Sequence, residues 1–78
     1  MLDSVLLCPL TSRVETAGPL RVSVVPGMAN GLLAPSLIMV DKVTALSRSR
    51  CREKIGAVDD AVLEQVNGLL LFVLGLLD

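Results

Sequence analysis

Residues 59–77 read DDAVLEQVNGLLLFVLGLL, and this stretch decides the fold class. Its apolar residues recur at three- and four-residue spacing, which is typical of an amphipathic helix. Asp59 suits the N-cap position, and Asp60 adds a negative charge in the first turn, where the helix dipole favours it. We therefore predict a helix that begins at Asp59 or Asp60 and ends near Leu76. Its predicted buried stripe is Val62, Val66, Leu69, Leu70, Val73 and Leu77.

The chain before this helix favours strands. The apolar runs at 4–10 and 37–46 are nearly continuous, which fits strands covered on both faces. Pro9 cannot donate to a ladder, so the first run ends, bulges or faces a sheet edge there. Residues 20–25 alternate between apolar and polar side chains, as in a half-buried strand. Residues 55–58 are predicted as a short last strand. This order predicts an α+β fold in which one helix closes a small barrel or curled antiparallel sheet.

Composition sets limits on function. The chain has 78 residues, so we expect a single domain over 1–78. With 53% hydrophobic and 19% charged residues and a net charge of −1, it is neither a disordered chain nor an overall basic nucleic-acid binder. The sequence holds no His, which excludes histidine acid–base catalysis and histidine-ligated zinc. The apolar run 69–74 is shorter than the ~20 residues that span a bilayer, so no membrane association is expected.

The two cysteines, Cys8 and Cys51, do not form a CxxC pair. Two cysteines in a chain without histidine cannot complete a zinc site unaided, so no metal site is expected. We predict two small buried thiols in a reducing cytoplasm. The first residues show no positively charged segment of a signal peptide, which agrees with a cytoplasmic location.

Several short motifs follow one another in a fixed order. They are Asp3-Ser4-Val5, Cys8-Pro9-Leu10-Thr11-Ser12, Asn30-Gly31-Leu32, Pro35-Ser36, Met39-Val40-Asp41-Lys42-Val43, Ile55-Gly56 and the helix itself, with Asp59-Asp60, Val66-Asn67 and Leu74-Gly75-Leu76. Each motif alone is weak evidence. The ordered set, from Asp3 to Leu77, resembles the MazF/PemK family of toxin–antitoxin mRNA interferases.

The resemblance implies an SH3-like barrel with a C-terminal helix, a homodimer, and inhibition by a cognate antitoxin protein. It also implies sequence-specific cleavage of single-stranded RNA in the cytoplasm, without a metal or other cofactor. Members of the family begin with two strands that carry an arginine before a proline. This sequence contains no Arg-Pro dipeptide, so we expect it to correspond to the C-terminal two-thirds of a toxin domain. The alternative is an inactive, truncated remnant that only dimerises or binds an antitoxin.

The family cleaves RNA by letting a ribose 2′-hydroxyl attack the adjacent phosphate, which requires a base, an acid and donors to the phosphate oxygens. By resemblance, Thr11 is the active-site threonine, Ser12 is a second RNA-binding hydroxyl, and Asp41 is a proton acceptor. An alternative remains for each of them. The hydroxyls can instead satisfy turn backbone, and Asp41 can pair with Lys42 or with the basic residues that follow.

A basic series follows the predicted strand at 37–46. If this stretch is extended, its side chains point the same way and can contact RNA phosphates. Alternatively, they form a solvated strand face that protects a sheet edge. The series is Arg48, Arg50, Arg52 and Lys54.

Overall fold

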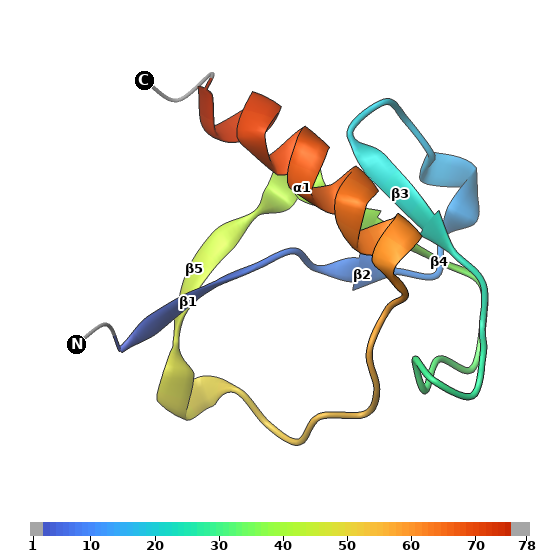
Figure 1. Ribbon diagram of the computed structural model, residues 1–78, viewed down its shortest axis with the longest axis horizontal. Helices are drawn as coiled ribbons and strands as arrows, with labels where there is room; N and C mark the ends of the chain where they lie inside the picture. The colour runs from blue at the N-terminus through green and yellow to red at the C-terminus, as the bar shows by residue number, and fades with distance from the viewer. Residues whose placement is uncertain (1–2, 76–78) are drawn as a thin grey trace.

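The computed structural model describes residues 3–75, which form two antiparallel sheets and one C-terminal helix (Figure 1). The strands are β1 (Ser4–Leu7), β2 (Leu10–Thr11), β3 (Arg21–Val24), β4 (Ser36–Met39) and β5 (Thr44–Ser47). The remaining elements are the 3-10 turns η1 (Val14–Thr16), η2 (Val40–Lys42) and η3 (Arg48–Arg50), and the helix α1 (Asp60–Gly75). One sheet pairs β1 with β5, and the other has the order β2-β4-β3. The α+β prediction is confirmed, and over residues 3–75 the sheets do not close into a barrel.

Two long antiparallel segments connect the sheets. One carries β1 and β2, and the other carries β4 and β5. The first segment is interrupted at Pro9, as the sequence predicts, and the Pro9 carbonyl accepts a hydrogen bond of 2.8 Å from the Met39 amide. An uninterrupted strand over 37–46 is wrong, because η2 divides it. This turn places Val40 in the core with 0% exposure, and the Val40 amide donates to the Leu20 carbonyl at 3.1 Å.

The core lies between one face of the three-stranded sheet and α1, which crosses in front of that sheet in Figure 1. Val22 and Val24 are buried while Ser23 is exposed, so the predicted alternation along β3 is confirmed. The helix contributes most of its predicted stripe to this core. The stripe residues that pack there are Val62, Val66, Leu69, Leu70 and Val73, and Leu77 lies outside the described residues.

The start of α1 agrees with the sequence. The Asp59 carboxylate accepts a 2.9 Å hydrogen bond from the Val62 amide, which is N-cap geometry. The structure describes the helix as far as Gly75, so the predicted end at Leu76 lies beyond the part described. Over residues 3–75, no helix is both long and apolar enough to cross a membrane.

The predicted strand at 55–58 is wrong. Residues 51–59 are irregular and run back from β5 to α1, along the lower edge of Figure 1. They dock on another loop: the Ala57 amide donates to the Ala29 carbonyl at 2.8 Å. A side chain at Gly31, whose φ is +68°, or at Gly56 would collide with the backbone of the opposite loop. Residues 55–58 therefore take part in a contact between two loops and do not pair with another strand.

The two thiols differ. Cys8 is half-buried against the core, and this burial raises the pKa of its thiol. Cys51 is exposed in the irregular segment after η3, so the prediction of two buried thiols is wrong for Cys51. Both cysteines are free.

Candidate functional site

Strand register places the candidate residues on the sheet face opposite the core. Thr11 pairs with Leu37, which pairs in turn with Ser23. Arg21 pairs with Met39, two positions further along the same strands. Because directly paired and i, i+2 residues share a face, Thr11, Ser23 and Arg21 lie on one side of the sheet. Asp41 follows Met39 and joins this face through Arg21.

Arg21 and Asp41 form a two-pronged ion pair. Arg21 Nε donates to Asp41 Oδ1 at 3.1 Å, and Nη2 donates to Oδ2 at 3.2 Å. The side chains are 16% and 29% exposed, so the pair is partly shielded from water. The sequence suggested Lys42 or the basic series as partners of Asp41. The structure instead selects an arginine 20 positions earlier, on β3.

The ion pair changes the chemistry of Asp41. Chiefly through its hydrogen bonds, and also through its charge, the Arg21 guanidinium holds the pKa of Asp41 below its usual value, although partial desolvation opposes the shift. Asp41 is therefore fully ionised at neutral pH. It is also a weaker proton acceptor than a free carboxylate, because a base works best when its pKa lies near the working pH. Asp41 as the catalytic base stays a prediction.

Thr11 is linked to this pair through the turn after β2. Arg21 Nη1 donates to the Thr16 hydroxyl at 2.8 Å and to its carbonyl at 3.3 Å. The Thr16 hydroxyl donates to the Arg13 carbonyl at 2.7 Å. The Arg13 amide donates to Thr11 Oγ1 at 3.1 Å. The Thr11 hydroxyl therefore does accept a hydrogen bond from the turn backbone, as the alternative interpretation predicts. It accepts this bond through an oxygen lone pair, so its hydroxyl hydrogen can still be donated to a ligand.

Ser12 and the basic series are exposed and differ in their surroundings. Ser12 lies in the bend directly after β2, next to Thr11. The basic series is not one extended stretch, because Arg48 and Arg50 belong to η3 and the other two residues lie in the irregular segment. The series follows β5, whereas Asp41 precedes it, and a four-residue strand is about 13 Å long. The structure does not gather the series around Thr11 and Asp41.

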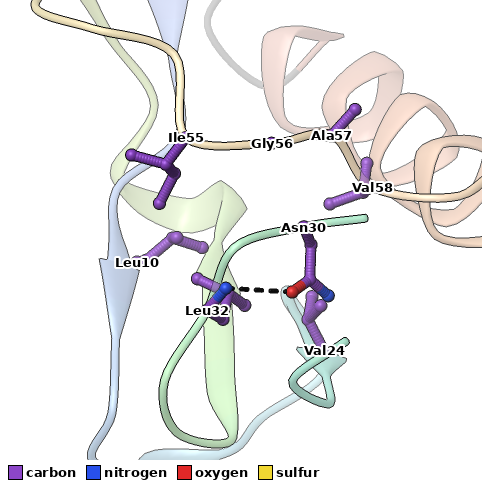
Figure 2. Close-up of a pocket in the computed structure, with 8 residues that line it drawn as sticks. All are labelled: Leu10, Val24, Asn30, Leu32, Ile55, Gly56, Ala57 and Val58. Atoms are coloured by element: carbon purple, nitrogen blue, oxygen red, sulfur yellow. Dashed lines mark hydrogen bonds between the residues drawn. The ribbon is translucent and has the colours of Figure 1, made fainter. Parts of the chain in front are cut away.

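A separate apolar pocket lies near the other loops. Its volume is about 160 Å³. Figure 2 shows the segment from Ile55 to Val58 crossing over Leu10, Leu32 and Val24, with Asn30 Oδ1 accepting a hydrogen bond from the Leu32 amide. None of its described lining residues is charged, so it offers a phosphate no balancing positive charge. Chemically, the polar face with Thr11, Arg21 and Asp41 is the better candidate site.

Sequence reasoning missed the roles of Arg21 and Thr16. A signal was present, because Arg21 is a single charge within the alternating stretch 20–25. A charged side chain on a half-buried strand needs an opposite charge near it. Asp41, which interrupts a run of strand-forming residues, is the matching signal. Nothing local joins Arg21 to Asp41, so only the fold shows the pairing.

Comparisons with known proteins agree on one family. The family model for PemK-like, MazF-like toxins of type II toxin–antitoxin systems matches residues 2–74. The probable endoribonuclease MazF of Mycolicibacterium smegmatis is 33% identical over 73 residues, which are 94% of this chain and 67% of that protein.

Two solved structures share the fold. An Mtb toxin has a TM-score of 0.77 at 21% identity, over 92% of this chain and 76% of its own. The Mycobacterium tuberculosis toxin MazF-mt6 also has a TM-score of 0.77, at 20% identity, over 95% of this chain and 72% of its own. At such identities the likeness concerns the fold alone.

Proposed function

This chain belongs to the PemK-like, MazF-like toxin family of type II toxin–antitoxin systems, and from that premise we propose that it is a sequence-specific endoribonuclease acting on single-stranded RNA without a metal ion. The match of the family model over residues 2–74 carries the proposal. We place the protein in the cytoplasm, where messenger RNA is the substrate. The two curled sheets belong, in this proposal, to an SH3-like barrel of the assembled toxin.

The proposed chemistry is attack of a ribose 2′-hydroxyl on the adjacent phosphate. Negative charge grows on the phosphate oxygens as the new P–O bond forms and the bond to the 5′-oxygen breaks. Thr11 donates a hydrogen bond to this phosphate, with Ser12 as a second donor beside it. Asp41 accepts the proton of the attacking hydroxyl, and the departing 5′-oxygen takes a proton from water. The exposed position of Ser12 and the free hydroxyl hydrogen of Thr11 support this assignment.

The test uses two proteins and a labelled single-stranded RNA. One is the 78-residue chain, and the other is this chain joined to the part of the M. smegmatis relative outside the matched 73 residues. We expect little cleavage by the chain alone. Arg21 is already bound to Asp41, and this sequence lacks the arginine before a proline that the family resemblance implies. A missing charged donor costs about 10²–10³ in rate. The joined protein should cleave equally well with a chelator present.

Paired variants of the joined protein identify the donor. Thr11→Ala should lose about 10²-fold or more in rate, whereas Thr11→Ser, which keeps the hydroxyl, should stay within about tenfold. A joined protein that does not cleave, or that is indifferent to Thr11→Ala, contradicts the proposed activity. Strong cleavage by the 78-residue chain alone would show that a further arginine is not needed.

The basic series is the proposed contact for RNA backbone and for an acidic segment of the cognate antitoxin. Such contacts weaken as salt rises, because bound counterions are released when the charges pair. Changing Arg48, Arg50, Arg52 and Lys54 together to Gln should weaken binding and flatten its salt dependence. Arg13→Gln is the control, since Arg13 is exposed and paired with Glu15. Binding that neither treatment changes would refute the electrostatic role.

We also propose a homodimer. Large apolar side chains remain exposed near the end of α1, where Leu71 is 76% and Phe72 57% exposed. A patch of this kind favours association, since its burial removes apolar area from water. Sedimentation at tens of micromolar should show a species larger than the monomer. A stable monomer would contradict the proposal.

A second candidate function is binding without cleavage. It is favoured by the ion pair, because Asp41 occupies the Arg21 guanidinium on the candidate face, and Arg21 in turn makes Asp41 a weaker base by lowering its pKa. In this case the chain would still dimerise or capture an antitoxin. The cleavage assay with the joined protein separates the two candidates.

A further inference from the structure

The hydrogen bonds around Arg21 form one continuous path from Asp41 to Thr11. Arg21 stands in the middle and binds Asp41 on one side and Thr16 on the other. Thr16 then binds the Arg13 carbonyl, and the Arg13 amide binds the Thr11 hydroxyl. We propose that Arg21 and Thr16 are positioning residues, which hold the turn after β2 so that the Thr11 hydroxyl is aimed at the scissile phosphate. This inference rests on the proposed function.

Arg21 is suited to position rather than to bind substrate. Its guanidinium is planar, and four bonds to two different elements fix its plane. The side chain is only 16% exposed, and Asp41 balances its charge. A phosphate would have to displace Asp41 to reach it. The energetically simpler role is to hold Thr16 in place.

Thr16 transmits the constraint through its hydroxyl. That hydroxyl accepts from Arg21 and donates to Arg13, so both partners fix its rotamer. The Arg13 carbonyl also accepts from the Thr16 amide at 3.0 Å. The backbone of Arg13 is thus bound on both sides, while its side chain reaches out to the exposed Glu15. Loss of the Thr16 hydroxyl removes one of the two hydrogen bonds to the Arg13 carbonyl, so it should loosen the Arg13 peptide and, with it, the Thr11 hydroxyl.

The first experiment measures amide hydrogen exchange of Arg13 by NMR in the 78-residue chain. Thr11→Ala removes the acceptor directly and sets the scale. Thr16→Val, which keeps the shape of the side chain, should speed exchange at Arg13 about fivefold, the effect of one typical hydrogen bond. Thr16→Ser, which keeps the hydroxyl, should leave exchange near that of the parent. Unchanged exchange in Thr16→Val overturns the inference.

The second experiment measures cleavage in the joined protein. Thr16→Val should lower kcat by about 10-fold or more at unchanged KM, because a small displacement of a reacting group costs rate and not affinity. Thr16→Ser should restore the rate. Arg21→Lys keeps the charge but loses the planar guanidinium that binds Asp41 and Thr16 at the same time. This variant should therefore behave like Thr16→Val. Equal kcat in Thr16→Val and Thr16→Ser overturns the inference.

The two readouts separate the inference from the proposed function. If Thr16→Val speeds exchange at Arg13 but no variant cleaves RNA, the positioning network stands and the proposed activity fails. If the joined protein cleaves in a Thr11-dependent way but Thr16→Val changes neither exchange nor kcat, the activity stands and the network has no positioning role. Arg21 variants that do not fold leave the Thr16 pair as the deciding test.

Discussion

Strands β1 and β4 have nearly the same sequence character but very different surroundings. β1 reads SVLL and β4 reads SLIM. In β4, Ser36, Leu37 and Ile38 are all buried between the flanking strands β2 and β3. Ile38 belongs to the core that α1 covers, whereas Leu37 is buried on the opposite face of the sheet. In β1 no residue is buried, and its only ladder partner in the described structure is β5. Burial here depends on what covers a strand, not on its composition.

This difference divides the described structure into a packed part and an open part. The packed part is the β2-β4-β3 sheet with η2 and α1, and it holds every residue that the structure buries between 3 and 75. The open part is the β1–β5 ribbon. A two-stranded ribbon is marginally stable by itself, since it lacks a face to bury. We therefore expect mutations in the packed part to unfold the domain and mutations in the ribbon to do little.

The largest effect is expected from a matched pair of leucines. Leu37 is 2% exposed in β4, and Leu6 is 56% exposed in β1. Leu37→Ala should lower the free energy of unfolding by about 2–5 kcal/mol, because it removes buried methyl groups and leaves a cavity. Leu6→Ala should stay within about 1 kcal/mol. Urea unfolding followed by circular dichroism measures both. Equal losses would abolish the distinction between the two parts.

The next effect concerns the loop contact that returns the chain to α1. Gly31 has φ +68°, and a Cβ there would collide with the Ile55 backbone. Gly31→Ala should cost about 1–3 kcal/mol, from the unfavourable backbone conformation and the displaced loop. Gly18→Ala is the control, since nothing lies within 4 Å of its added Cβ. Equal melting temperatures of the two variants would show that residues 51–59 do not rest on the loop around Gly31.

The smallest effect concerns Asp41 and depends on pH. Its folded-state pKa lies below the ordinary value of 3.8, so the unfolded chain binds the proton more tightly. The ion pair therefore stabilises the fold above pH 3.8, and this contribution disappears as the pH falls through the lowered folded-state pKa. Asp41→Asn should cost about 1 kcal/mol or less at pH 7.

The control for Asp41→Asn is Glu15→Gln. Glu15 pairs with Arg13 on the surface, where both side chains are largely exposed. Thermal unfolding of both variants and the parent is measured from pH 7 down to pH 2. The difference in stability between Asp41→Asn and the parent should disappear as the pH falls. No such convergence is expected for Glu15→Gln. A stability difference that persists unchanged at the lowest pH would mean that the carboxylate charge does not stabilise the fold.

Local features of the fold could be predicted from the sequence. The N-cap at Asp59, the apolar stripe of α1 and the alternation along β3 each depend on residues within one or two turns or strand positions. These are the patterns that helix and strand periodicity impose directly on side chains. The break at Pro9 follows from a single missing amide hydrogen.

Features set by distant contacts could not be predicted. η2 interrupts a good strand sequence because Val40 turns into the core and bonds to Leu20. Residues 55–58 are irregular because two glycine-bearing loops meet there. The Arg21–Asp41 pair joins residues on separate elements, and no local pattern records it. For the candidate site, Thr11 and Asp41 could be named from the family resemblance. Only the structure shows the path of hydrogen bonds that connects them through Arg13, Thr16 and Arg21.

The register of β1 against β5 has a consequence for the order of assembly. Ser4 pairs with Ser47, whereas the β3–β4 hairpin brings together residues much nearer in sequence. At a synthesis rate of about 5–20 residues per second, β5 follows β1 by roughly 2–8 seconds. During that interval β5, the partner of β1 in the described structure, has not yet been made. Loop closure over such a distance is also slow, so β1 is expected to pair with β5 later than β3 pairs with β4.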